Sequence, residues 1–315
     1  MASIDTPLVS VIMAVYNGEE FLREAVLSVL NQTLTEFEFI IVNDGSADAS
    51  SQILNSFDDE RIVLVERGNR GLPSSLNEAI SIAKGEYIAR MDADDVSLPN
   101  RLQLQYEYMR NHPEVGLVGG QALIIDAMGG EIGEARKPVG FELIKRYIEY
   151  ACPVLHPTYF VRRGVYESIA RYRQIPIEDY DFLFRIVEYG VIIENMPNFL
   201  IEYRYVSSGL TLFNPQRTTV LTRAIKKMHE LRVCGLGLKE KELMLFVNSY
   251  DAKASWWFKK VYVLRSMAKN ALFGYKKRGG RIWVWSMIFL IFLISLLHYQ
   301  VFIESFSTYK ASKLV

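Results

Sequence analysis

Short apolar runs alternate with helical patterns through the first hundred or so residues, and this alternation limits the possible fold more than any other feature. The runs, each short enough for one strand, are LVSVIMAV (8–15), FEFIIVN (37–43), RIVLV (61–65) and EYIARM (86–91). Helical patterns follow at about 21–30, beginning from Asn17 or Gly18, then at about 47–57 and 72–84, and from Pro99 onward. This order predicts an α/β fold with a mostly parallel sheet and helices on both of its faces.

Polar residues follow each of the four apolar runs. They are Tyr16-Asn17, Asn43-Asp44-Gly45, the segment from Arg67 to Gly71, and the acids Asp92, Asp94 and Asp95. In open parallel sheets, ligands bind outside the carboxyl ends of the strands. The sequence therefore predicts that four polar strand ends converge on one crevice.

The segment RMDADD (90–95) places three carboxylates within four positions. Like charges this close repel one another, and Arg90 is the one counter-charge that the sequence supplies nearby. A divalent cation is the obvious further counter-charge, so the cluster predicts a metal site.

The second half of the chain has a mixed pattern. VGLVGG and ALIID within 115–126 predict two strands, with MGGE as the turn that follows. The next predicted elements are a helix at 141–150, an extended segment TYFVRR (158–163) and a helix at 179–190. We expect a catalytic domain over 1–205, a basic and aromatic helical extension over 206–281, a membrane helix at 282–303 and a short tail at 304–315.

The C-terminal third is strongly asymmetric in charge. Residues 253–281 carry nine Lys or Arg and no acid, although the whole chain has a formal net charge of zero. Residues 282–303 carry no formal charge, and a helix of that length spans roughly 33 Å, enough for a bilayer core. The preceding KKRGGR predicts attachment at the cytoplasmic face of the cell membrane by a single-pass helix. The alternatives are a buried core helix or a hairpin in one leaflet at 282–303, and an ordinary packed helix instead of an interfacial one before it.

The bulk composition fits a globular protein, with 50% hydrophobic and 23% charged residues. Cys152 and Cys234 are far apart and lack metal-ligand spacing. No disulfide framework is predicted, which is typical of a reducing compartment.

Four segments taken together resemble the family 2 glycosyltransferases. They are VSVIMAVYNGEEFLREAVLSVLNQT, FIIVNDGSADAS, NRGLPSSLNEAISIAKGEYIARMDADD and IEDYDF, and the resemblance covers roughly residues 7–205. It implies a GT-A fold with a Rossmann-like sheet and an inverting transferase of the hexosyltransferase type. The expected partners are a nucleotide-sugar donor, a glycolipid or oligosaccharide acceptor and the membrane, with no nucleic acid.

The resemblance assigns the metal-binding DxD triplet to Asp92-Ala93-Asp94. Asp94 would bind Mg²⁺ or Mn²⁺ on the donor diphosphate, where negative charge builds as the sugar departs. Asp92 would be a second ligand or contact the nucleotide ribose. We expect Asp95 to cap the segment before Pro99.

The resemblance also assigns the nucleotide pocket. Asp44 would read the base, because a carboxylate accepts the ring N–H of uracil, which cytosine lacks; a UDP-sugar is therefore expected. The same turn predicts Ser46 as the N-cap of the next helix. The other expected nucleotide contacts are Ala14, Tyr16, Asn17, Arg67 and Asn69.

Glu178-Asp179 matches the acceptor-side acidic pair of the family. An inverting transferase needs a base for the attacking hydroxyl, and we expect Asp179 to be that base. Glu178 would support it or bind the acceptor, and repulsion between the two would raise one pKa. The alternative is a pair of acids stabilised at a helix N-terminus. His156 would approach the diphosphate or the acceptor, or be structural.

The chain departs from relatives in two places. The Q-x-x-R-W motif of processive members is absent, so transfer of a single sugar is expected. Tyr203-Arg204-Tyr205-Val206 lacks the His of the YR-x-H motif, which leaves open the group that assists the leaving diphosphate, with Arg204 and Tyr205 as candidates.

Two other functions are less consistent with the sequence. A sugar nucleotidyltransferase needs a Gly-rich loop with Arg and Lys after the first strand, where this chain has AVYNGEEFL. A non-catalytic nucleotide-sugar-binding module would not need both the DxD triplet and the Glu178-Asp179 pair.

Overall fold

The computed structural model describes residues 6–205 except 170 and 176, together with Thr222, Ile225, Lys226 and His229. These residues belong to one compact unit within Met1–Met244. The predicted membrane helix at 282–303, the tail and nearly all of the basic extension lie outside the described residues. Within the described ranges, no helix combines the length and apolarity needed to cross a membrane.

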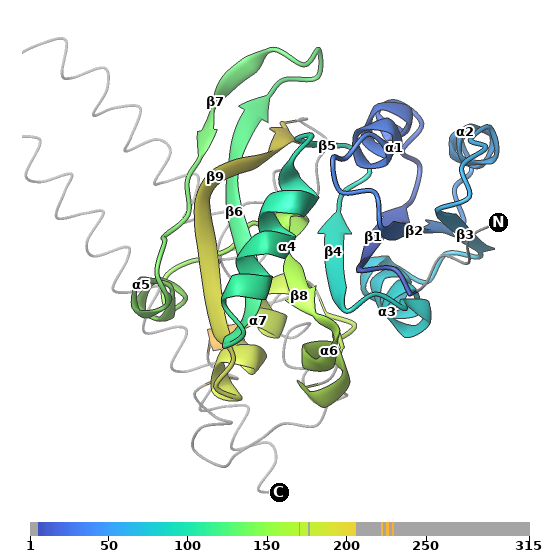
Figure 1. The fold of residues 1–315 in the computed structure, drawn as a ribbon. Coiled ribbons are helices and arrows are strands. Elements are labelled where there is room, and N and C mark those ends of the chain that lie inside the picture. Colours follow the sequence, from blue (N-terminus) through green and yellow to red (C-terminus); the bar gives the residue numbers. More distant parts are fainter. Residues whose placement is uncertain are drawn as a thin grey trace, which may run out of the picture. The chain divides into compact units, whose positions relative to one another are not determined.

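The four predicted strands form the parallel half of the sheet (Figure 1). In spatial order they are β3 (Ile62–Arg67), β2 (Phe37–Asp44), β1 (Val9–Val15) and β4 (Tyr87–Met91). The pairings of β1 with β2, β1 with β4 and β2 with β3 are all parallel, as the alternation of strands and helices predicted. Their carboxyl ends therefore lie along one edge.

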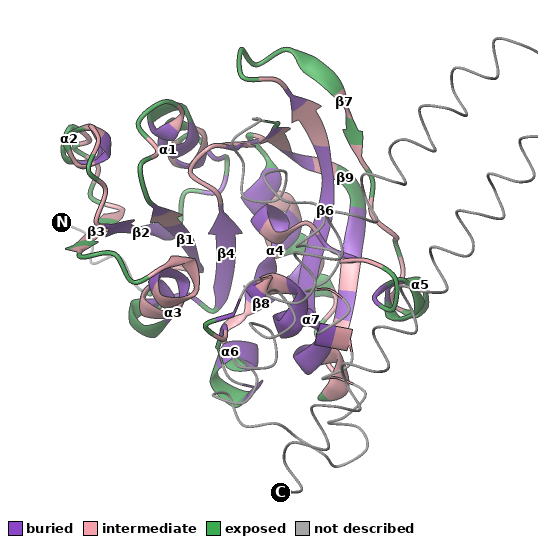
Figure 2. Ribbon diagram, turned by 180° about the vertical axis from the view of Figure 1, so that it is seen from behind, coloured by how far each residue is buried: buried purple, intermediate pink, exposed green. Residues whose placement is uncertain are grey.

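Helices α1 (Leu22–Leu30) and α3 (Leu72–Ile82) lie on opposite sides of these strands (Figure 1). Every residue of β2 is buried, as Figure 2 shows for the central strands, because both faces of the sheet are covered. Phe39 lies in the main core with Ala25 and Val26 of α1. Truncating a buried aromatic such as Phe39 to Ala costs about 3–5 kcal/mol, so this core holds the strand ends in place.

Two predicted helix starts are corrected. α1 begins at Leu22 instead of Asn17 or Gly18, because Asn17 adopts a left-handed φ of +50° that cannot continue a helix. α2 (Ser50–Asn55) is shorter than predicted, and its first N–H, that of Ser50, is accepted by Oδ1 of Asp48 at 3.0 Å. The hydroxyl of Ser46 instead accepts the N–H of Asn17 at 3.0 Å, so the prediction that Ser46 is an N-cap was wrong.

The other half makes the sheet mixed rather than mostly parallel. Its strands are β5 (Val96–Ser97), β6 (Val115–Ile125), β7 (Glu131–Ala135), β8 (Phe160–Arg162) and β9 (Ile192–Arg204). β8 is antiparallel to β4 and β6, whereas β9 is parallel to β6 and antiparallel to β5. β6 and β7 are antiparallel because the short turn between them allows no crossover.

The remaining elements surround this second half. β6 is one strand where the sequence predicted two, and the predicted extended segment 158–163 is strand only at β8. The helices are α4 (Arg101–Asn111), α5 (Phe141–Tyr147), the 3₁₀ turn η1 (His156–Thr158), α6 (Arg163–Ile169) and α7 (Glu178–Glu188). α7 confirms the predicted helix, and Glu178 at its start lies 4.0 Å from His156 of η1.

Candidate active site

The ends of β1 and β2 are tied together by their turns. Val15 pairs with Asn43 across the two strands. Beyond them, the Asn17 side-chain oxygen accepts the N–H of Ala47 at 2.8 Å. The ring of Tyr16 is 57% exposed at this edge, and Ala14 is half-buried beside it. An exposed aromatic ring beside a polar strand end can stack on a planar base.

Asp44 holds the loop that follows β3. Its Oδ1 accepts the N–H of Arg70 at 2.9 Å and lies 2.9 Å from Nη2 of Arg67, and its Oδ2 accepts the N–H of Gly71 at 2.8 Å. A Cβ at Gly45 would lie 2.7 Å from the backbone nitrogen of Asn69, so only glycine allows this close approach. Because a carboxylate has four lone pairs, one lone pair on Oδ2 remains for a single further donor.

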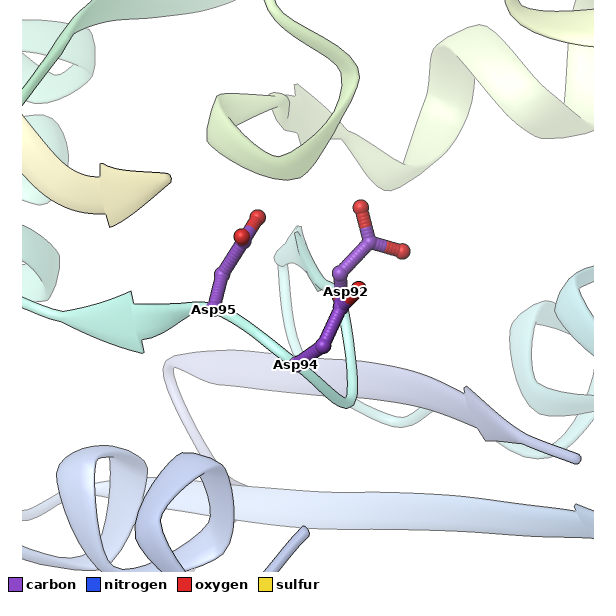
Figure 3. A group of neighbouring side chains, drawn as sticks. All are labelled: Asp92, Asp94 and Asp95. Carbon is purple, nitrogen blue, oxygen red and sulfur yellow. The ribbon is translucent and has the colours of Figure 1, made fainter. Parts of the chain in front are cut away.

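The acids Asp92, Asp94 and Asp95 lie on the turn between β4 and β5 (Figure 3), called here the acidic turn. One carboxylate oxygen from each lies within 4.8 Å of the others. Asp92 forms a two-point ion pair with the buried guanidinium of Arg90. Burial, and then the charge of Asp92, raise the pKa of Asp94 to about 6, with Arg90 opposing the shift. The predicted counter-charge, Arg90, is therefore present, but it pairs directly with Asp92 and not with Asp94 or Asp95.

Asp95 does not cap α4, contrary to prediction. It is 1% exposed, and its Oδ1 accepts the N–H of Arg204 at 2.8 Å because β5 pairs with β9 beside it. Its Oδ2 is buried and has no hydrogen-bond partner among the described residues. Burial, then the charges of Asp92 and Asp94, raise the pKa of Asp95 well above its usual range.

Arg204 is committed to the fold. Its Nε donates to the carbonyl of Asp94 at 2.9 Å, its Nη1 to the carbonyl of Asp126 at 3.2 Å, and its Nη2 to Glu24 at 2.5 Å. The structure therefore contradicts the expectation that Arg204 assists the leaving diphosphate. Tyr205, half exposed at the end of β9, stays a candidate.

The acidic pair opens α7 after a strained residue. Ile177 has φ +55° and ψ +44°, a left-handed conformation that is rare for a β-branched side chain. Burial, and then the charge of Asp179, raise the pKa of Glu178 to about 8. Burial also raises the pKa of Asp179, but the backbone N–H of Tyr180 and the charge of Arg90 oppose it. Near neutrality this favours a proton on Glu178.

Three side chains, of which only Tyr172 is buried, form the surroundings of the pair. The Cys152 thiol lies 3.8 Å from Oδ2 of Asp179, and His156 Nδ1 lies 4.0 Å from Oε1 of Glu178. The other ring nitrogen of His156 is 3.0 Å from the Tyr172 hydroxyl. Burial, then the charge of Arg90, depress the pKa of His156, so the imidazole stays neutral.

Arg90 connects the acidic turn with the pair on α7. Its N–H donates to the carbonyl of Tyr159 at 2.9 Å, which joins β4 to the segment that carries His156. Its positive charge partly opposes the rise in the pKa values of Glu178 and Asp179. The two acidic groups that the sequence singled out are thus within electrostatic reach of one another.

The comparisons with known proteins agree with this arrangement. The family model described as "Glycosyl transferase family 2" matches residues 10–170, which is more than half of the chain. The chain belongs to glycosyl transferase family 2. This glycosyltransferase carries the triplet Asp92-Ala93-Asp94 directly after β4 of its α/β sheet.

Two relatives illustrate the similarity. The uncharacterized glycosyltransferase MJ1057 of Methanocaldococcus jannaschii is 34% identical over 235 residues, covering 72% of this chain and 77% of its own length. The amylovoran biosynthesis glycosyltransferase AmsE of Erwinia amylovora is 29% identical over 230 residues, covering 71% of this chain and 85% of its own.

Two solved structures have the same fold. TarS of S. aureus, solved with UDP, has a TM-score of 0.55 at 19% identity and covers 78% of this chain and 71% of its own. The mannosyltransferase PcManGT of Pyrobaculum calidifontis, solved with GDP-Man and Mn²⁺, has a TM-score of 0.55 at 18% identity, covering 98% and 85%. These similarities establish the GT-A-like fold of this family 2 glycosyltransferase.

The acidic turn of this glycosyltransferase fits a hard divalent cation. It offers only oxygen ligands, which Mg²⁺ and Mn²⁺ prefer. The unpartnered Oδ2 of Asp95 and the raised pKa of Asp94 both indicate carboxylates that lack a full counter-charge. Asp92 is the poorest of the three donors because Arg90 already pairs with it.

Sequence reasoning missed one residue beneath the site. Arg101, at the start of α4, is fully buried, and its Nη2 donates to the carbonyl of Arg90 at 2.7 Å. Burial, then the charge of Arg90, lower the pKa of Arg101 to about 9. Arg101 therefore fixes the end of β4, and no local pattern marks it.

Proposed function

We propose that this family 2 glycosyltransferase is a metal-dependent, inverting enzyme that transfers one sugar from a UDP-sugar to a glycolipid or polysaccharide acceptor in cell-surface polysaccharide biosynthesis. The observation that carries the proposal is the acidic turn at the end of β4 within electrostatic reach of the acidic pair on α7. The name of AmsE, a biosynthetic enzyme for amylovoran, supports the assignment to polysaccharide synthesis.

The hydrogen bonds of Asp44 favour a uracil base. The N–H groups of Arg70 and Gly71 bind one oxygen each, Nη2 of Arg67 lies 2.9 Å from Oδ1, and Oδ2 keeps a lone pair for a ligand. Uracil offers one ring N–H there, whereas guanine offers an adjacent ring N–H and amino group that need two acceptors. Tyr16 would stack on the base, with Asn17, Arg67 and Asn69 around it. UDP should therefore bind more tightly than GDP in calorimetric titrations, and equal affinities would contradict this assignment.

A divalent cation would be held by Asp94, with Asp95 Oδ2 and the partly exposed Asp92 nearby. When bound, it stabilises the negative charge that develops on the diphosphate leaving group. Mn²⁺ in the PcManGT structure supports this choice of cation class.

Asp179 would act as the general base. It takes the proton of the acceptor hydroxyl as that oxygen forms a bond to the anomeric carbon and the bond to the diphosphate oxygen breaks on the opposite face. The raised pKa of Glu178 keeps that carboxyl protonated near neutrality, so Glu178 can donate a hydrogen bond to the acceptor. His156 would lie beside Glu178 as a neutral imidazole, so it would not stabilise a negative charge on that carboxyl.

We also propose attachment to the cytoplasmic face of the membrane through residues 282–303. The support is the sequence itself, 22 residues without formal charge that follow a segment with nine cations and no acid. The domain boundaries at 205, 281 and 303 belong to the same proposal.

Donor turnover tests the proposed chemistry. UDP release from a panel of UDP-sugars, measured with an acceptor lipid extract and Mn²⁺, should fall by more than about a hundredfold in Asp179→Asn, the range lost with a general base. Titration with UDP should show unchanged donor affinity in the same variant. Turnover close to wild type in Asp179→Asn would exclude it as the base.

A further inference from the structure

A polar cavity of about 370 Å³ lies between α3 and residues 171–174. All eight residues that line it are polar or charged. Its lining includes Arg67 and residues of α3 but none of the acidic turn. No aromatic or aliphatic side chain lines it, so its chemistry favours a charged ligand over a sugar ring or a lipid chain.

Hydrogen bonds join the two walls of the cavity. The Asn77 amide nitrogen donates to the carbonyl of Tyr172 at 2.8 Å, and the N–H of Tyr172 donates to the Asn77 oxygen at 2.9 Å. Farther along, the Gln174 amide donates to the Ser74 hydroxyl at 2.8 Å. These bonds join segments 95 to 100 residues apart, so specific contacts fix the two walls relative to one another.

Positive charge dominates the lining. Three arginines, Arg67, Arg70 and Arg171, are accompanied by one acid, Glu78. Arg70 and Arg171 are exposed, and the carbonyl of Arg171 is held at 2.8 Å by Nη2 of Arg185. Such a pair of accessible guanidinium groups on an anchored wall suits an oxyanion, because the planar N–H fork matches its geometry.

The buried arginine supplies a second, independent observation. The Arg67 side chain is 7% exposed, with Nη2 at 2.9 Å from Asp44 and Nε at 2.9 Å from Glu78. Its Nη1 is buried and has no hydrogen-bond partner among the described residues. A buried N–H without an acceptor is costly, so the site lacks an acceptor that a ligand can supply.

We propose that this cavity is a binding site for a phosphate group, with Arg70 and Arg171 as its principal contacts and Arg67 at its floor. The phosphate can be free in solution or carried on a lipid headgroup. None of these contacts involves the acidic turn or the pair on α7. Arg67 is also a proposed nucleotide contact, so the test below uses Arg70 and Arg171, which are not.

Titration with inorganic phosphate tests the site in the full chain. EDTA and the absence of nucleotide keep phosphate from binding through a metal at the acidic turn, and chloride keeps the ionic strength constant. Phosphate should raise the melting temperature saturably and broaden its ³¹P signal. Arg70→Gln and Arg171→Gln should each weaken this binding about tenfold, the loss expected for one charge-assisted hydrogen bond, while the exposed Arg110→Gln on α4 should not.

Vesicles distinguish the source of the phosphate. Phosphatidylcholine vesicles with and without phosphatidic acid are compared for wild type, Arg171→Gln and Arg110→Gln. A phosphatidic-acid-dependent gain in binding that Arg171→Gln alone reduces would assign a headgroup, and a response to inorganic phosphate alone would assign the free anion. If Arg70→Gln and Arg171→Gln bind both probes as well as wild type does, the proposal is overturned.

Discussion

At the scale of single residues, the chemistry depends on where buried charges are balanced. Arg90 neutralises Asp92, whereas Asp94, Asp95 and Glu178 carry raised pKa values because burial is only partly offset. The sequence indicated the crowding of the acids and the counter-charge of Arg90. It did not indicate that Asp95 binds the N–H of Arg204, because that contact joins residues 109 positions apart.

Glu178 should make the stability of the protein depend on pH. Its pKa rises from an ordinary 4.5 to about 8 in the folded state, so between these values the folded state holds a proton that the unfolded state has lost. The free energy of unfolding should therefore fall as pH rises through this window, by a few kcal/mol at most, at about 1.4 kcal/mol per pKa unit.

Glu178→Gln should reduce this slope, since the amide cannot ionise. The slope should not vanish, because Asp94, Asp95 and Asp179 also have raised pKa values. Urea unfolding in EDTA at about pH 5 and about pH 8 measures the effect, with the exposed Glu142→Gln as control. If wild type and Glu178→Gln lose stability equally over that range, the raised pKa is contradicted.

At the scale of elements, periodicity and length decided what could be predicted. β1 to β4 were predicted because each is a short apolar run between helical patterns. β9 (Ile192–Arg204) was missed because the exposed Pro197 and Asn198 interrupt its pattern, and its pairing with β6 involves residues far away in the chain. β5 has only two residues and no periodicity to detect.

These missed strands position the acidic turn through Arg204. Arg204→Ala should lower the free energy of unfolding by about 3 kcal/mol. It removes the Arg204 donor from the part-buried carbonyl of Asp94, one of the donors to Asp126, and the pair with Glu24. The matched control is Arg136→Ala, which removes an exposed pair with Glu134 and should cost less than about 1 kcal/mol. Equal losses in urea unfolding would show that Arg204 does not hold the turn.

At the scale of the whole molecule, the charge asymmetry of the sequence predicts a membrane-attached enzyme with a separate catalytic unit. A variant that ends at residue 281 should leave the membrane fraction at least in part and still bind UDP, because every proposed nucleotide contact lies before residue 205. Sedimentation with vesicles measures the first and titration the second. Complete sedimentation of the shortened chain with vesicles would exclude 282–303 as the anchor.

The central claim is that the acidic turn holds a cation on the diphosphate of the donor. Calorimetric titration of UDP into wild type and Asp94→Asn, with Mn²⁺ and then with EDTA, tests it most directly. We expect Mn²⁺ to strengthen UDP binding in wild type by more than about tenfold, and Asp94→Asn to lose that gain while its binding in EDTA is unchanged. An Mn²⁺-dependent gain of the same size in Asp94→Asn would contradict the account.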